Sequence, residues 1–145
     1  MKLEQLEAEW LADSKITSND LGNEALKIPF LHHKWYKFMI EERILLHKLK
    51  EDIAEKEFML EGFFAKTLTV EELHANNLTY TDKKILRPDI PRHIAIHPII
   101  INLKLKLSLQ YEKCEYLKDI IKMIHSRSFL IKDAIEWHKF SNGLN

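Results

Sequence analysis

The chain has 145 residues, of which 46% are hydrophobic and 30% are charged, and only three are glycine. This length predicts one domain, and high charge with few glycines favours long helices over a turn-rich β-sandwich. Lys and Arg together number 22, as do Asp and Glu, so the net charge is zero and composition alone does not indicate a nucleic-acid binder.

Cysteine content and hydropathy indicate the cellular environment of the protein. Cys114 is the only cysteine, which excludes a disulfide framework and favours a reducing, cytoplasmic environment. The acidic start does not match a secretory signal peptide. No apolar run approaches the roughly 18–20 residues of a membrane span. We therefore expect a soluble protein with no membrane partner.

Two short helices are predicted within residues 1–28. Apolar residues recur at helical spacing over 2–13, and turn residues follow. The second short helix is expected to end before Pro29, because a proline disfavours helical geometry in the residue before it.

A long helix is predicted over residues 29–66. Pro29 fits its first turn, where the missing N–H costs nothing. Between Phe30 and Phe64 the only Gly or Pro is Gly62, and apolar residues recur at threes and fours. A helix this long exceeds the usual range of about 8–20 residues, so we expect a long hairpin or a coiled coil.

Residues 67–98 interrupt this pattern. Three prolines and several Asn and Thr residues remove any helical period. We predict an irregular connection with one short helix near residues 70–75. A connection of this length is uncommon in a compact domain and is usually either mobile or functional.

Residues 99–140 admit two interpretations. Over 99–111, apolar and polar residues alternate as they do in a strand. A heptad pattern extends much further, so we predict one long helix with two apolar seams. The first seam comprises the columns Ile100, Leu107, Cys114, Ile121, Ser128 and Ile135, and Leu103, Gln110, Leu117, Ile124, Ile131 and His138; the second seam comprises Leu109, Tyr116, Met123, Leu130 and Trp137.

Two seams on one helix indicate two neighbours. The helix at 30–64 can cover one of them, so the other is expected to face a second copy of the chain. The alternative is that the N-terminal helices cover it in a monomer. We predict a homo-oligomer with residues 99–140 as its oligomerisation helix. The expected interface residues are Ile121, Ile124, Arg127, Ser128, Ile131, Ile135 and Trp137.

Arg127 and Ser128 interrupt the apolar pattern of that helix. The small side chain of Ser128, within the first seam, permits close approach of a neighbouring helix. Arg127 carries a planar five-donor fork that suits an acidic partner. Because residues 1–30 hold six Asp or Glu against three Lys or Arg, we expect that partner in the first thirty residues of the next subunit.

Catalytic and metal-binding motifs are weak in this sequence. Glycines stand only at 22, 62 and 143, which excludes a phosphate-binding glycine loop. His93 and His97 have the i, i+4 spacing of a metal pair, but prolines bracket them and no acidic residue stands at a position typical of a third ligand. We predict no enzyme, no metal site and no cofactor.

Aromatic and basic residues are the better functional candidates. Phe63, Phe64 and Lys66 end the long helix, and single-stranded nucleic acid is bound by stacking on aromatic rings and by cations along its phosphates. The alternative is that the rings of Phe63 and Phe64 belong to the hydrophobic core and that Lys66 is exposed to solvent. Repetition in an oligomer would strengthen a weak site through effective concentration. Further DNA-binding cations, chosen on charge alone, are Lys56, Lys83, Lys84, Arg87 and Arg92.

Several stretches resemble the UvsY recombination mediator family of T-even-type phages and their cyanophage relatives. They are MKLEQLEAEW at 1–10, DSKI at 13–16, KIPFLH at 27–32, KWY at 34–36, LQY at 109–111 and IHSRSFLIKDAIEWHKF at 124–140, followed by Gly143. The resemblance runs in order over nearly the whole chain, whereas the middle, 67–98, matches poorly.

This resemblance implies a small, all-α, non-enzymatic mediator that forms a ring-like homo-oligomer in the cytoplasm of a phage's host. It implies three partners besides the protein itself: single-stranded DNA, the phage single-strand-binding protein and a RecA-like recombinase. The mediator would help the recombinase replace the binding protein on DNA.

The family's DNA-binding segment falls on residues 62–66, with two departures. Phe63-Phe64 and Ala65 stand where relatives often carry Tyr-Tyr and Gly, and Phe58 and Leu60 stand where some members carry a Lys/Arg pair. The missing pair and the zero net charge keep an alternative open, a helical oligomeric adaptor that binds only protein partners.

Overall fold

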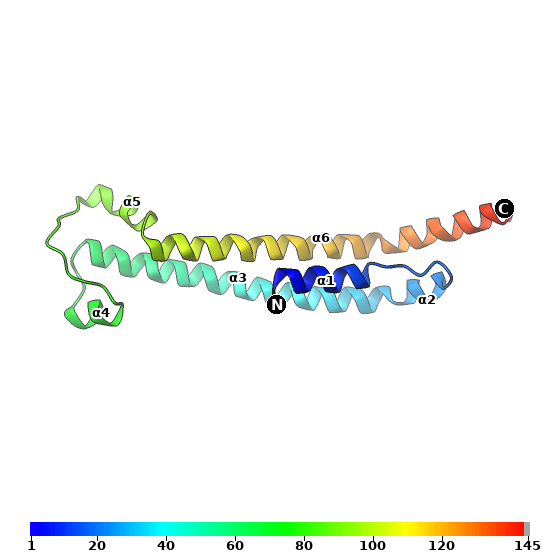
Figure 1. Ribbon diagram of the computed structural model, residues 1–145, viewed down its shortest axis with the longest axis horizontal. Helices are drawn as coiled ribbons and strands as arrows, with labels where there is room; N and C mark the ends of the chain where they lie inside the picture. The colour runs from blue at the N-terminus through cyan, green and yellow to red at the C-terminus, as the bar shows by residue number, and fades with distance from the viewer. Residues whose placement is uncertain (144–145) are drawn as a thin grey trace. The chain divides into compact units, whose positions relative to one another are not determined.

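The computed structural model describes residues 1–143, which contain helices and no strand (Figure 1). The elements are α1 (Leu3–Asp13), α2 (Leu21–Leu26), α3 (Ile28–Phe64), α4 (Val70–Ala75), the 3-10 turn η1 (Arg87–Asp89), α5 (Ile90–Ala95) and α6 (Pro98–Ser141). The predicted all-α class with two long helices and short N-terminal helices is confirmed, and residues 99–111 are helical rather than extended.

The connection between the long helices holds more regular structure than its sequence indicates. The predicted short helix is α4, whose first turn is capped by Thr69: its hydroxyl accepts a hydrogen bond from the N–H of Glu72 at 3.2 Å. The prediction missed η1 and α5, because Pro88 and Pro91 suggested breaks. Both prolines lie in the first turn of a helical segment, where a missing N–H loses no partner.

The chain divides into two compact units, and α3 and α6 each contribute to both. Unit 1 comprises Met1–Ile44 and Tyr111–Asn145, and unit 2 comprises Leu45–Gln110. Since both long helices run through this division, it does not decide between one domain and two, and the single domain stays a prediction.

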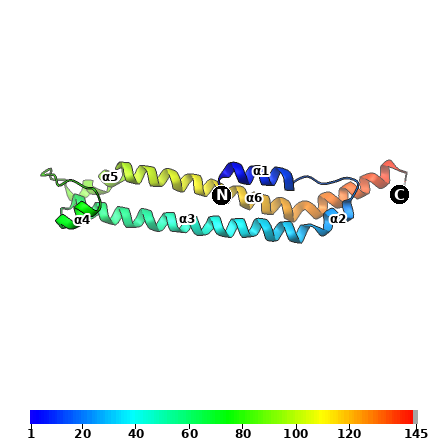
Figure 2. The same cartoon turned by 60° about the horizontal axis from the view of Figure 1, so that its bottom comes forward.

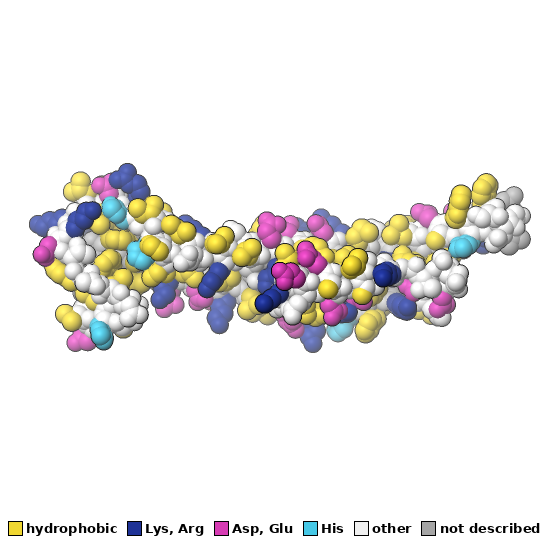
Figure 3. Space-filling model, in the orientation of Figure 1, with side chains coloured by type: hydrophobic (Ala, Val, Ile, Leu, Met, Phe, Trp, Pro, Cys, Tyr) yellow, Lys and Arg dark blue, Asp and Glu magenta, His cyan; other side chains and the backbone are white. Residues whose placement is uncertain are grey.

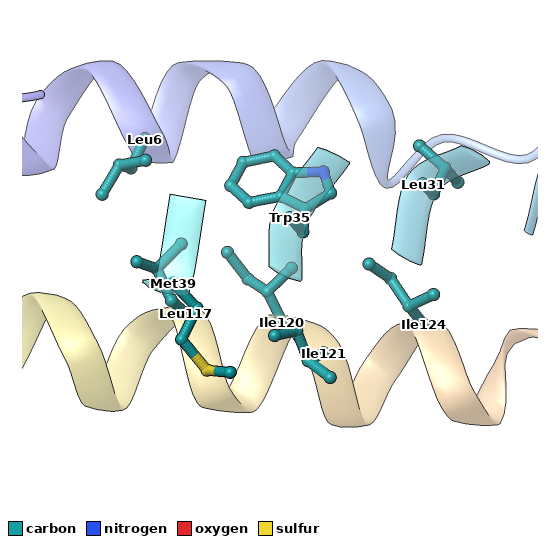
Figure 4. Close-up of a cluster of buried hydrophobic side chains, with 8 residues drawn as sticks. All are labelled: Leu6, Leu31, Trp35, Met39, Leu117, Ile120, Ile121 and Ile124. Atoms are coloured by element: carbon teal, nitrogen blue, oxygen red, sulfur yellow. The ribbon is translucent and has the colours of Figure 1, made fainter. Parts of the chain in front are cut away.

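Unit 1 packs α1 against the first part of α3 and the middle of α6 (Figure 2). Trp35 is fully buried, and its ring meets those of Trp10 and Phe38 edge-on, with centroids 5.5 and 5.3 Å apart. Such T-shaped pairs add about 0.5–1.5 kcal/mol to the burial of area. The buried cluster consists of Leu6, Leu31, Trp35, Met39, Leu117, Ile120, Ile121 and Ile124 (Figure 4).

Polar contacts fix the C-terminal end of α1 against α3. The carboxylate of Asp13 accepts hydrogen bonds from Lys34 at 2.7 Å and from the indole N–H of Trp35 at 3.0 Å. Lys34 also contacts Glu9 at 2.8 Å. Burial alone lowers the pKa of Lys34, but these hydrogen bonds outweigh it and raise the pKa, so the ammonium stays charged.

Arg127 forms a buried salt bridge inside unit 1. Its Nη2 lies 3.0 Å from Oε2 of Glu24, and the two side chains are 4% and 3% exposed. The guanidinium also donates to the carbonyls of Asp13 and Lys15, each at 3.1 Å. The acidic partner expected in the first thirty residues is therefore present, but it belongs to the same chain and not to the next subunit.

Helical register explains which residues of α6 are buried near this salt bridge. Arg127 follows Ile124 by three positions and precedes Ile131 by four, so it continues the buried face. Ser128, expected in the first seam, is exposed instead. Of the predicted interface residues, Ile121, Ile124, Arg127 and Ile131 are buried within the chain, whereas Ser128, Ile135 and Trp137 are exposed.

The second seam is largely uncovered within the chain. The side chains of Leu109, Met123, Leu130 and Trp137 are 59%, 50%, 46% and 66% exposed, and only Tyr116 packs against the core of unit 1. Hydrophobic side chains on the surface towards the end of α6 are visible in Figure 3. The N-terminal helices therefore do not cover this seam as the monomer alternative requires.

In unit 2 the rest of α3 lies beside the start of α6 (Figures 1 and 2). Leu46, Ile53 and Leu60 are buried along α3 at intervals of seven residues, and Ile100 is buried on α6. Ile90 of α5 is buried as well. This packing brings α5 close to the end of α3, because the ring of Phe64 contacts the rings of His93 and His97.

Candidate nucleic-acid interface

A tight turn at the end of α3 fixes the position of Lys66. The N–H of Thr67 donates to the carbonyl of Gly62 at 2.9 Å, and that of Lys66 donates to Phe63 at 3.2 Å, which are the two bonds of a Schellman C-cap. Lys66 occupies the position where glycine is usual, with φ at 61°. A non-glycine residue in this left-handed region strains the backbone by about 1–2 kcal/mol.

Gly62 lets the chain fold back over the end of the helix. A Cβ at this position would lie 3.0 Å from Cδ2 of Leu68 and 3.3 Å from Oγ1 of Thr67. A side chain at residue 62 would therefore require Leu68 to shift from its close packing over the last helical turn. This placement makes Leu68 part of the pocket that opens beside the turn.

A pocket of about 190 Å³ is formed by the end of α3, α4, α5 and the chain between α4 and η1. None of the described residues that line it carries a carboxylate, so aromatic rings and positive charge meet there without a competing acid. Figure 3 shows Lys and Arg side chains beside hydrophobic ones near α5, whereas His and Asp or Glu side chains lie over α4. Its lining residues are Phe63, Phe64, Lys66, Leu68, Leu73, Tyr80, Thr81, Lys83, Ile85 and His93.

Ring contacts hold the walls of this pocket together. The centroid of Phe64 lies 5.2 Å from that of Phe63 and 5.7 Å from that of His93, in both cases with the rings tilted. Across the turn, the ammonium of Lys66 lies 5.0 Å from the ring centroid of Tyr80 and donates to the carbonyl of Thr81. Lys66 thus ties the connection after α4 to the end of α3.

Four of the eight residues predicted to bind DNA line this pocket: Phe63, Phe64, Lys66 and Lys83. The other four do not. Arg87 lines a separate groove of about 560 Å³ that also contains Glu57 and Glu61, which would repel a phosphate. Arg92 lies 3.7 Å from Asp89. Lys56 is partly buried on α3, and Lys84 is exposed outside the pocket lining.

Tyr80 and His93 are pocket residues that the sequence reasoning did not select for DNA. Tyr80 is the only Phe, Trp or Tyr between residues 65 and 110, and an isolated ring in a polar segment was the available signal. Its place in the pocket depends on the contact between Lys66 and Thr81, fifteen residues apart, which no local pattern reveals.

The titratable groups of the described residues show no metal-binding arrangement. Among residues 1–143, no group of three His, Cys, Asp or Glu side chains is placed to hold a metal ion. His93 and His97 pack their rings against Phe64. Cys114 is buried, and burial raises the pKa of its thiol, which disfavours the reactive thiolate.

Among residues 1–143, no helix is both long enough and apolar enough to cross a bilayer.

Residues 9–144 match the sequence profile of a family described as recombination, repair and ssDNA binding protein UvsY. No curated protein sequence matches the chain significantly. Among solved structures, the bacteriophage T4 recombination mediator protein UvsY is similar in two crystal forms. The lattice type II form has a TM-score of 0.82 at 15% identity over 98% of both chains. The lattice type IV form has a TM-score of 0.80 at 16% identity, covering 97% of this chain and 99% of that chain.

At these identities the crystal structures establish a shared fold, and the family assignment rests on the sequence match over residues 9–144. That match covers nearly the whole chain, including both long helices and the residues that line the pocket. The chain therefore belongs to the UvsY family of recombination, repair and single-stranded-DNA-binding proteins.

Proposed function

We propose that this recombination mediator binds single-stranded DNA at the pocket beside the end of α3, and that it helps load a RecA-like recombinase onto DNA covered by the phage single-strand-binding protein. The observation that carries the proposal is the meeting of Phe63, Phe64, Lys66 and Lys83 at one pocket without a carboxylate. Aromatic rings for stacking and cations for phosphates are the two components that single-strand binding requires.

One such site is weak, and assembly would strengthen it. We propose a ring-like homo-oligomer in which the exposed second seam of α6 contacts a neighbouring copy, because four apolar side chains of that seam are 46–66% exposed within the chain. Several copies along one strand gain affinity through effective concentration. A mediator built this way releases DNA stepwise, which suits handing the strand to a recombinase in the cytoplasm of the phage's host.

The DNA-binding proposal is tested by fluorescence anisotropy of labelled oligo-dT at several salt concentrations. Affinity should fall steeply from low to moderate salt, since each neutralised phosphate releases a counterion. Lys66→Ala should weaken binding further. Lys48→Ala removes an exposed lysine of α3 that lies outside the pocket and serves as the matched control. Absent or salt-independent binding would contradict the proposal.

The alternative function, a protein-only adaptor, is favoured by the groove that Arg87 lines. Phe58 lines this groove and is 78% exposed, and aromatic side chains are enriched at protein interfaces. Glu57 and Glu61 line the groove as well and would repel DNA phosphates. An adaptor should capture the recombinase or the single-strand-binding protein in a pull-down while showing no affinity for oligo-dT. Pull-down and anisotropy on the same preparation therefore separate the two functions.

A further inference from the structure

We infer that the pocket beside the end of α3 binds a single unstacked base of the DNA strand, with Tyr80 at the opening of the pocket. The protein then recognises a free base in addition to the phosphate chain. This inference rests on the proposed function, since it specifies what part of the DNA the site holds. The supporting observations are the size of the pocket, the positions of its rings and the placement of its charges.

The size of the pocket restricts what can enter it. About 190 Å³ is less than the roughly 300–1,000 Å³ of typical small-molecule pockets, so one planar ring system is a better fit than a longer segment. The walls suit the flat faces of such a ring: Phe63, Phe64 and His93 are partly buried aromatic side chains from two different helices. Leu73 of α4 and Ile85 add apolar surface to the walls, and neither side chain has a hydrogen-bonding group.

Tyr80 occupies a different position from the other rings. Its side chain is 63% exposed although it lines the pocket, which places it at the opening and not in the interior. One face of the ring is already engaged by the ammonium of Lys66, 5.0 Å from its centroid. A base entering the pocket can pass this ring and stack with it, because every base has a π-face and such stacking tolerates any sequence.

The charges at the pocket suit a base that arrives attached to phosphates. Lys66 and Lys83 both line the pocket, and no described lining residue carries a negative charge. Lys66 donates to the carbonyl of Thr81, a neutral partner that a phosphate oxygen can replace with a charge-assisted hydrogen bond. A base and its adjoining phosphates would therefore be bound together, by the aromatic walls and by the two lysines.

This mode of binding has a consequence for the form of DNA that is bound. A base within a duplex must be unpaired and unstacked before it can enter such a pocket, whereas a base in a single strand is already free. The pocket thus gives a preference for single strands that charge attraction alone does not give. A duplex presents a denser array of phosphates, and a purely electrostatic surface would bind it at least as well.

The decisive experiment uses the wild-type full chain and two labelled oligomers with equal numbers of phosphates. One is oligo-dT and the other is the same backbone made entirely of abasic sites. At equal salt, the abasic oligomer should bind about 5- to 150-fold more weakly, the affinity equivalent of one stacked base. Equal affinity for the two would overturn the base pocket while leaving DNA binding in place. Failure to bind either oligomer would instead reject the proposed function.

A set of variants locates the effect at the pocket. Tyr80→Ala should weaken binding of oligo-dT several-fold while leaving the abasic oligomer unchanged, and Tyr80→Phe should retain the wild-type difference. Tyr111→Ala removes an exposed tyrosine of unit 1 that is not part of the pocket and serves as the control. Equal weakening of both oligomers by Tyr80→Ala would contradict the inference. Unchanged DNA affinity with lost capture of a protein partner would also overturn it and assign the pocket to that protein.

Discussion

Lys66 combines a strained backbone with a cation at the candidate site, and the two roles can be separated by substitution. Its φ of 61° lies in the left-handed region that glycine adopts freely. Lys66→Ala and Lys66→Gly both remove the contacts to Tyr80 and Thr81, but only the alanine variant keeps the strain. The glycine variant should therefore be more stable by about 1 kcal/mol. Urea denaturation followed by circular dichroism measures this difference.

Both variants should lose the same share of oligo-dT affinity, because the cation is missing from each. Asn77 provides a comparison at the end of α4, where it also has positive φ, 53°, and lies outside the pocket lining. Asn77→Gly should leave DNA affinity unchanged. If the glycine variant at position 66 bound oligo-dT as tightly as wild type, the side chain of Lys66 would have no part in the site.

Arg127 is expected to act on folding before it acts on assembly. Replacing it with alanine leaves Glu24 buried, with a side chain 3% exposed and without its arginine partner. Breaking a buried ion pair on one side costs about 3–5 kcal/mol, so Arg127→Ala should lower the free energy of unfolding by an amount in this range. Lys27→Ala removes the other partner of Glu24, but this lysine is itself 57% exposed, so the variant should cost less than Arg127→Ala. Similar losses in the two variants would contradict the buried role of Arg127.

Glu24 should also make the stability of unit 1 sensitive to acid. The hydrogen bond from Lys27 lowers the pKa of this carboxyl, burial raises it, and the hydrogen bond from Arg127 lowers it, with a net decrease. Stability from a lowered pKa is complete above the ordinary glutamate value of about 4.3 and is lost as pH falls through the lowered pKa. The melting temperature should therefore fall on acidification below about pH 4.3 more steeply in the wild type than in Glu24→Gln. If the melting temperatures of the two proteins fell equally with pH, the ionised Glu24 carboxylate would not contribute to stability.

At the scale of helices, the ends of the long elements could be predicted because local chemistry determines them. Pro29 lies in the first turn of α3, and the predicted end near Phe64 coincides with the cap at Lys66. The helix at 99–111 was predicted correctly because a heptad pattern extends past the short alternation. The failure at α5 has a physical reason as well: Pro91 can start a helix as readily as it ends one, and sequence alone does not distinguish the two.

The candidate site could be predicted only in part, because local residues supply half of it. Phe63, Phe64 and Lys66 are neighbours in sequence, so their meeting was foreseeable. Tyr80 and His93 reach the same pocket through the fold of the connection, which depends on long-range contacts. Arg127 shows the same limit: the sequence indicated an acidic partner in residues 1–30, but whether that partner belongs to the same chain depends on how α2 packs.

The exposed second seam of α6 is the element expected to mediate assembly. Leu130 is 46% exposed, so Leu130→Glu should keep the helical content and melting temperature of the wild type while lowering the mass measured by light scattering. Ile131 is only 2% exposed, so Ile131→Asp should unfold unit 1 instead. Leu26→Glu, at a position 78% exposed on α2, should change neither property. A wild type with the mass of one 17.3 kDa chain would contradict the oligomer.

For the whole molecule, a net charge of zero makes assembly decisive for DNA binding. With 22 basic and 22 acidic side chains, the chain has no general attraction to a polyanion, so affinity depends on how many local sites engage one strand. The dissociated Leu130→Glu variant retains the complete pocket, since Leu130 lies outside it. Its affinity for a long oligo-dT should nevertheless fall by about 10²-fold or more, and its salt slope should decrease, because fewer phosphates are neutralised per bound particle.

Oligomer length supplies the control for this last prediction. On an oligo-dT long enough for only one pocket, the wild type and Leu130→Glu should bind with nearly equal affinity, because neither can then engage a second site. The difference between the two proteins should grow as the oligomer is lengthened. A constant ratio at every length would show that Leu130→Glu damages the site itself, and that the pockets of different copies do not share one strand.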